Sequence, residues 1–160
     1  MSETQKHGEN RARVGVYEKY GWVIFLALGL LWLVVGLNQL FIPDTLLGNE
    51  VQHITGMSLS ELEASSPVAT EMVRWAFGAI GNLKMSWSFL VLAITLTGYR
   101  RGEKWAWYTL WLCPAILVGQ GLFDSVFLGD FNEMLQWIPI TSISLLGLLL
   151  PIRKFFPRKS

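Results

Sequence analysis

Cysteine is nearly absent from this chain. Cys113 is the only one in 160 residues, so an intrachain disulfide is excluded. Histidine is also scarce: His7 lies near the N-terminus and His53 in a polar stretch, so no pair of histidines within an apolar run could hold a b-type haem. No metal-ligand spacing surrounds the lone thiol. We therefore predict no metal site and no resident cofactor.

Catalytic motifs are missing as well. The sequence contains no nucleophile elbow, no phosphate-binding glycine loop and no zinc-protease helix. Glycines within long apolar runs are more typical of helix packing in membranes. We name no catalytic residue, and the sequence favours a non-enzymatic protein while leaving that question open.

Charge is missing from four long stretches of a chain that is 52% hydrophobic: 21–37, 85–99, 105–123 and 135–152. A helix needs about 20 apolar residues to cross roughly 30 Å of hydrocarbon. We predict an all-α polytopic membrane protein, a bundle of four transmembrane helices. The first run is long enough to span and lacks a cleavage site, so we do not expect a signal peptide. The predicted segments are a tail at 1–19, a transmembrane domain at 20–153 with helices at about 20–42, 75–99, 104–124 and 134–153, an outer loop at 43–66 and a tail at 154–160.

The outer loop at 43–66 and the connection at 125–133 lack Lys and Arg, and most of the basic residues gather elsewhere. They are Lys6, Arg11, Arg13 and Lys19 in the N-terminal tail, Arg100, Arg101 and Lys104 in the middle link, and Arg153, Lys154, Arg158 and Lys159 at the C-terminus. This bias predicts that both termini are cytoplasmic and that the protein lies in the cell membrane. Basic clusters beside helix ends favour lipid headgroups, so we expect the bilayer as a partner and no nucleic acid.

The outer connection carries its own helix signals. Pro43 and Asp44 should end the first helix and begin a turn. Ser58 followed by Glu61 fits a capping box, which predicts a short helix over 59–65. Ser66 and Pro67 fit the start of the next helix, which would run to about residue 99 and exceed the thickness of the hydrocarbon.

That second long helix keeps three charges. Glu71 and Arg74 lie three residues apart in its first turns and can pair at headgroup level. Lys84 lies ten residues beyond Arg74, or about 15 Å further in. Its ammonium could snorkel outward along the stem, or it could face the bundle interior as a functional group. The second interpretation is favoured because Lys84 lies at the edge of a face of small residues, which includes Gly78 and Gly81.

Polar residues on the other helices fall at a similar predicted depth. The candidate ligand-binding cluster therefore consists of Lys84, Asn82, Arg74, Glu71, Asn38, Gln39, Gln120 and Asp124. We expect Lys84 to pair with Asp124, Glu71 or Gln120. The alternative is that these groups form interhelical hydrogen bonds that serve only to hold the helices together. Pro114 removes a backbone hydrogen bond in the third helix and is expected to bend it.

Three pairs of segments resemble each other in the same order. EKYGW (18–22) matches EKWAW (103–107), LVVGLNQLF (33–41) matches ILVGQGLF (116–123), and EMVRW (71–75) matches EMLQW (133–137). One explanation is a duplicated two-helix hairpin with residues 51–70 inserted in the first copy. The other is convergence, because every membrane interface favours aromatic and charged residues.

Four short helices and the basic, aromatic link GYRRGEKWAWY (98–108) make the chain similar to small prokaryotic four-helix membrane proteins of the DoxX-like group. The resemblance implies a subunit of a quinone-linked or thiol-related membrane complex, and it transfers no catalytic residue. Two functions remain open. One is a non-enzymatic subunit of a membrane complex or a homo-oligomer. The other is a binder of a lipid or quinone-like molecule in an outer-leaflet pocket around Lys84.

Overall fold

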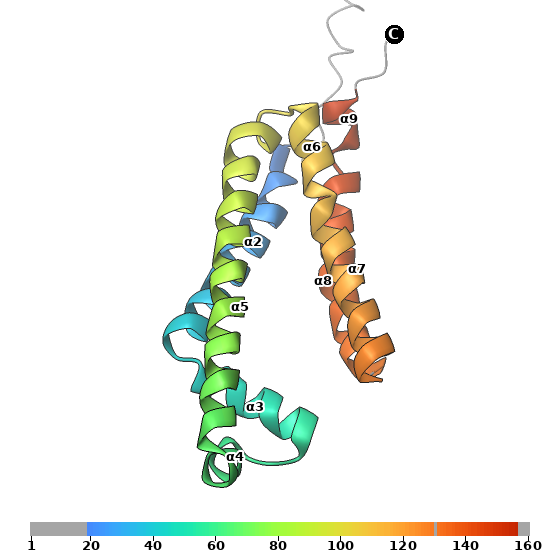
Figure 1. The fold of residues 1–160 in the computed structure, drawn as a ribbon. Coiled ribbons are helices and arrows are strands. Elements are labelled where there is room, and N and C mark those ends of the chain that lie inside the picture. Colours follow the sequence, from blue (N-terminus) through green and yellow to red (C-terminus); the bar gives the residue numbers. More distant parts are fainter. Residues whose placement is uncertain (1–18, 130, 157–160) are drawn as a thin grey trace, which may run out of the picture. The chain divides into compact units, whose positions relative to one another are not determined.

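A computed structural model describes residues 19–129 and 131–156 (Figure 1). Its elements are α2 (Trp22–Phe41), α3 (Asp44–Thr55), α4 (Leu59–Ser65), α5 (Pro67–Ile94), the π-helix η2 (Thr95–Tyr99), α6 (Lys104–Leu110), α7 (Leu112–Phe123), the π-helix η3 (Asp124–Leu128), α8 (Phe131–Leu149) and α9 (Ile152–Phe155). No strand occurs among the described residues. The all-α prediction is thus confirmed for this part of the chain.

Long apolar helices dominate the structure, as an α-helical membrane protein requires. Three are long and apolar enough to cross a bilayer: Trp22–Phe41, Pro67–Tyr99 and Lys104–Phe127. The segment Trp137–Leu149 is also apolar but shorter. The helices therefore fit a membrane protein, and a fourth span rests on a shorter apolar stretch.

The chain divides into two compact units. The first unit runs from Phe25 to Thr97, and the second unit combines the segment ending at Ile24 with the chain from Gly98 onward. Each unit is described by itself below.

In the first unit, α2 packs directly against α5 through glycine. A Cβ at Gly36 would lie 2.9 Å from the carbonyl oxygen of Gly81 and 2.9 Å from Cγ of Met85. A Cβ at Gly81 would lie 2.9 Å from the carbonyl oxygen of Gly36. The two backbones approach so closely only because both positions lack a side chain. This part of the predicted small-residue face is a helix contact, whereas a Cβ at Gly78 would meet nothing within 4 Å.

The connection between α2 and α5 is largely helical, which differs from the expected loop. Pro43 does form a turn, since the N–H of Thr45 donates to the carbonyl of Ile42 at 3.3 Å. Helix α3 then follows at once and buries Leu47 and Val51. Helix α3 was not predicted, because a proline beside an aspartate favours a helix start as readily as a loop.

The short helix α4 is confirmed with its cap. The Ser58 hydroxyl accepts a hydrogen bond from the Glu61 N–H, and the Glu61 carboxylate accepts one from the Ser58 N–H at 2.7 Å. Helix α5 begins at Pro67, as expected, with Ser66 in the cap position. The Ser66 side chain makes no capping hydrogen bond, so only its position matches the prediction.

In the second unit, α7 lies beside α8 (Figure 1). The third apolar helix is interrupted at Trp111, between α6 and α7, three residues before Pro114. Proline has no N–H, so the local hydrogen-bond ladder tightens, with the Trp111 N–H donating to the Tyr108 carbonyl at 3.2 Å. The expected bend at Pro114 stays a prediction, and the structure shows this interruption near that residue.

Aromatic side chains donate hydrogen bonds to two carbonyls near the end of α8. An α-helical carbonyl normally accepts from the residue four positions ahead, and for Gly147 that residue is Pro151, which has no N–H. The Tyr99 hydroxyl donates to the Gly147 carbonyl instead. The indole N–H of Trp107 donates to the next carbonyl, that of Leu148, at 3.0 Å. Two rings thus satisfy the backbone where α8 ends.

Candidate functional site

Arg74 gathers three carboxylates at one end of the first unit. Its Nε and Nη2 donate to Asp44 at 2.9 and 3.3 Å, and Nη1 donates to Glu71 at 2.9 Å. Nη2 also donates to Glu63 at 3.3 Å. The predicted pairing of Glu71 with Arg74 is confirmed, and the guanidinium fork serves two further acids.

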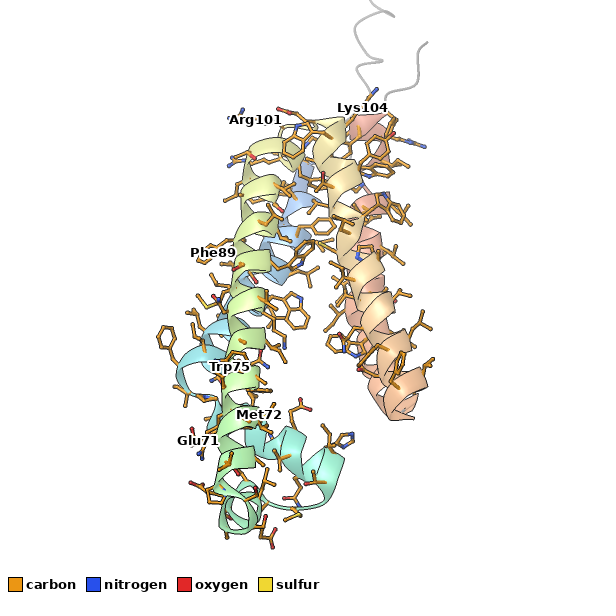
Figure 2. The ribbon with its side chains drawn as sticks, in the orientation of Figure 1. Glu71, Met72, Trp75, Phe89, Arg101 and Lys104 are labelled. Carbon is orange, nitrogen blue, oxygen red and sulfur yellow. The ribbon has the colours of Figure 1, made fainter. Side chains whose placement is uncertain are left out.

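This Arg74 cluster ties three helices together. Asp44 opens α3, Glu63 lies in α4, and Glu71 shares α5 with the arginine. Glu71 lies near the α4 end of α5 in Figure 2. The three carboxylates are 54, 52 and 73% exposed, so the pairs are screened by solvent. The cluster positions the connecting helices and occupies four of the five guanidinium N–H donors.

Lys84 has a different environment. Its Nζ lies 5.6 Å from the centre of the Trp32 ring, within cation–π distance. Trp32 stands nine residues before the end of α2, or about 14 Å along the axis. Among the described residues no carboxylate forms an ion pair with Lys84. The ammonium is thus held alongside α2 and retains its hydrogen-bonding capacity.

The remaining polar residues of the first unit do not gather around Lys84 through hydrogen bonds. The side-chain Oδ1 of Asn38 accepts from the Thr45 hydroxyl at 2.7 Å, which links α2 to α3. Gln39 is only 5% exposed, and its Oε1 has no hydrogen-bond partner among the described residues. The side chain of Asn82 is exposed and makes no hydrogen bond within the described part of the chain.

The second unit has its own polar group at the α7–α8 end. Asp124 is 6% exposed and accepts hydrogen bonds from Gln120 Nε2 at 2.9 Å and from the Trp137 indole at 3.1 Å. The bond to Trp137 joins η3 to α8. Asp124 falls in a π-helix, where the extra residue in the turn changes the direction of the side chains.

The eight predicted residues therefore form several separate arrangements. Glu71 joins Arg74, Gln120 joins Asp124, and Asn38, Gln39, Asn82 and Lys84 each have surroundings of their own. Lys84 and Asp124 belong to different units, so their expected pairing stays a prediction.

Sequence reasoning missed the partners Asp44, Glu63, Thr45, Trp32 and Trp137. A signal for two of them was present: Arg74 is the only Lys or Arg between Lys19 and Lys84. The acidic residues of the connection therefore had one cation within reach. No comparable signal marked Trp32, because eight tryptophans share the chain.

The chemistry of these groups is that of binding and packing. No cluster of three His, Cys, Asp or Glu side chains that could hold a metal ion is found in the described ranges. Cys113 is a free, half-buried thiol. Amide, indole, carboxylate and ammonium groups remain, and these can hold a polar headgroup or a neighbouring helix.

No protein-family model matches the sequence, and no match is found among curated proteins or among solved structures.

Proposed function

We propose that this chain is a non-enzymatic subunit of a cell-membrane complex or a homo-oligomer. In this proposal it crosses the bilayer four times, with Trp137–Leu149 in the fourth span and both termini in the cytoplasm. The resemblance to DoxX-like proteins, which rests on the link at 98–108, supports a role as a subunit. The long apolar helices support residence in a membrane.

Asn82 carries the proposal. It lies eight residues beyond Arg74 on α5, or about 12 Å along the axis, within a helix apolar enough to span. Its exposed amide finds no partner among the described residues, and Ala79 and Ser86 on the same helix are exposed as well. A polar amide facing hydrocarbon is costly, whereas small residues let another helix approach and satisfy it. A partner helix is the arrangement that uses both features.

Native mass spectrometry after gentle extraction tests the proposal. We expect the wild-type chain to carry a second copy or a second polypeptide. Asn82→Leu should reduce the associated fraction about threefold, the usual effect of one interhelical hydrogen bond. Ser86→Ala is the matched control, because the Ser86 hydroxyl already donates to its own helix, to the Asn82 carbonyl at 3.0 Å.

The control should associate as the wild type does. A wild-type chain that is a bare monomer under conditions that preserve other membrane complexes would overturn the proposal. Equal association of the wild type and Asn82→Leu would remove Asn82 as the contact.

A second function is favoured by the surroundings of Lys84. An ammonium that lies over an indole and forms no ion pair among the described residues can donate to the phosphate of a lipid or the carbonyl of a quinone. Under this alternative, the extracted wild type should retain a small amphipathic molecule, and Lys84→Met should lose it while Lys84→Arg keeps it. Retention by Lys84→Met would exclude the alternative.

The orientation is tested by labelling. In a chain whose native thiol is replaced by Cys113→Ser, Ser65→Cys should react with a membrane-impermeant thiol reagent in intact cells, and Ser160→Cys should not. The reverse pattern would exclude cytoplasmic termini.

A further inference from the structure

A cavity of about 380 Å³ lies at the basic end of the second unit. Its lining comes from three segments that are far apart in the sequence: Lys19 and Tyr20 just before α2 with Trp22 at its start, Arg100 after η2, and Lys154 in α9. Three of the five lining residues are cations and the other two are aromatic. Figure 2 labels Arg101 and Lys104, which belong to the same basic link but do not line the cavity.

Neighbouring groups hold the cations in place. The Arg100 guanidinium lies 5.1 Å from the centre of the Trp22 ring, and Lys19 Nζ lies 5.3 Å from that of Tyr20. Lys154 Nζ donates to the Arg100 carbonyl at 2.7 Å. The Lys154 stem also passes close to Gly102, where a Cβ would be 3.1 Å from its Cε. Gly102 has a φ of +82°, so the tight turn and the close stem both require glycine here.

The described residues around the cavity supply no ion pair that would balance its positive charge. No ion pair to Lys19, Arg100 or Lys154 occurs among the described residues. The carboxylate of Glu103 in the same link instead accepts from the Trp105 indole. Burial lowers the pKa of Lys154, and the adjacent charge of Arg100 lowers it further. An anion between these side chains would relieve the repulsion.

We propose that this cavity binds the phosphate group of an anionic lipid or of a free phosphate compound. A phosphate offers several acceptor oxygens to a guanidinium fork and two ammonium groups, and it carries the charge the cavity lacks. Tyr and Trp favour the headgroup level of a bilayer, which places the rings beside a lipid phosphate. Residues Lys19 and Tyr20 are helical, so these two side chains reach the cavity from helical backbone.

Lipid titration followed by native mass spectrometry tests this site in the purified full-length chain. The probes are phosphatidic acid and phosphatidylcholine with identical acyl chains. We expect tighter binding of phosphatidic acid, and a loss of about fivefold for each cavity charge removed, in Lys19→Gln and Arg100→Gln. Arg100→Lys keeps the charge and should retain most of the affinity.

Arg101→Gln and Lys104→Gln are the matched controls, since they remove the same charge from the same link outside the cavity. They should bind phosphatidic acid within twofold of the wild type. Inorganic phosphate added as competitor separates the sources: displacement at millimolar concentration indicates a site for free phosphate, and its failure indicates a lipid site. Equal losses in cavity and control variants, or no preference for phosphatidic acid in the wild type, would overturn the proposal.

Discussion

The two units hold their long helices together by different means. In the first unit, Gly36 and Gly81 let the backbones of α2 and α5 touch. In the second unit, Tyr99 and Trp107 reach the carbonyls at the end of α8, one of which Pro151 leaves without its helical partner. Close backbone contact needs the absence of side chains, whereas a proline-broken helix needs side chains that donate hydrogen bonds.

This difference bears on the proposed duplication. Gly36 and Gly119 occupy matching places in LVVGLNQLF and ILVGQGLF. A Cβ at Gly36 would strike the backbone of α5, whereas a Cβ at Gly119 would meet nothing within 4 Å. Glycine at these two matching positions thus has two different structural roles. Duplication stays a hypothesis, and if it is right, the two copies have diverged in how they pack.

The glycine pair gives the largest expected effect. Gly36→Ala should destabilise the protein by about 2–3 kcal/mol, because the new methyl group must push α5 away. Gly119→Ala is the control and should stabilise α7 by up to about 1 kcal/mol, since alanine favours a helix and the space is open. Thermal unfolding in detergent measures both. Equal shifts for the two variants would contradict the difference between the units.

The polar groups at the predicted outer ends of the two units also differ. The carboxylates around Arg74 are exposed, whereas Asp124 is buried. Asp124→Ala should cost about 2 kcal/mol, because it leaves the Trp137 and Gln120 N–H groups without their acceptor and removes the tie between η3 and α8. Asp124→Asn keeps one acceptor oxygen and should cost less. Arg74→Gln should have a smaller effect than Asp124→Ala, since its ion pairs are exposed. Denaturant unfolding in detergent measures the stability loss of each variant. A larger loss for Arg74→Gln than for Asp124→Ala would contradict this order.

Tyr99 tests how α8 ends. Tyr99→Phe removes the donor to the Gly147 carbonyl and should cost about 1 kcal/mol. Tyr108→Phe is the matched control: that residue is 58% exposed, and no hydrogen bond of its hydroxyl is found in the described part of the chain. Thermal unfolding should separate the two variants. A Tyr99→Phe variant that melts with the control would show that water or lipid satisfies the carbonyl equally well.

How much the sequence predicted depends on the range of the interaction. Local rules found the capping box of α4 and the pairing of Glu71 with Arg74, because each depends on residues three positions apart. Contacts across 30 or more residues were missed, such as Asp44 with Arg74 and Tyr99 with Gly147. The π-helices were missed too, since one extra residue in a turn leaves no mark in hydrophobic periodicity.

The smallest expected effect lies in the capping box of α4. The Ser58 backbone N–H, and then its hydroxyl, stabilise the ionised form of Glu61 and lower the pKa of that carboxyl. A lowered pKa in the folded state means that protonation favours the unfolded segment. The cap should therefore contribute fully above the ordinary glutamate pKa, and its contribution should disappear as the pH falls below about 4.

Amide hydrogen exchange of α4 across that range, with the protein in detergent, measures the effect directly. Exchange at the Ser58 and Glu61 amides should become faster in acid, after correction for the intrinsic pH dependence of exchange. Glu61→Gln keeps an acceptor for the Ser58 N–H but cannot ionise, so its protection should be lower at neutral pH and constant across the range. A Glu61→Gln variant whose protection still falls with acid would place the titrating group elsewhere.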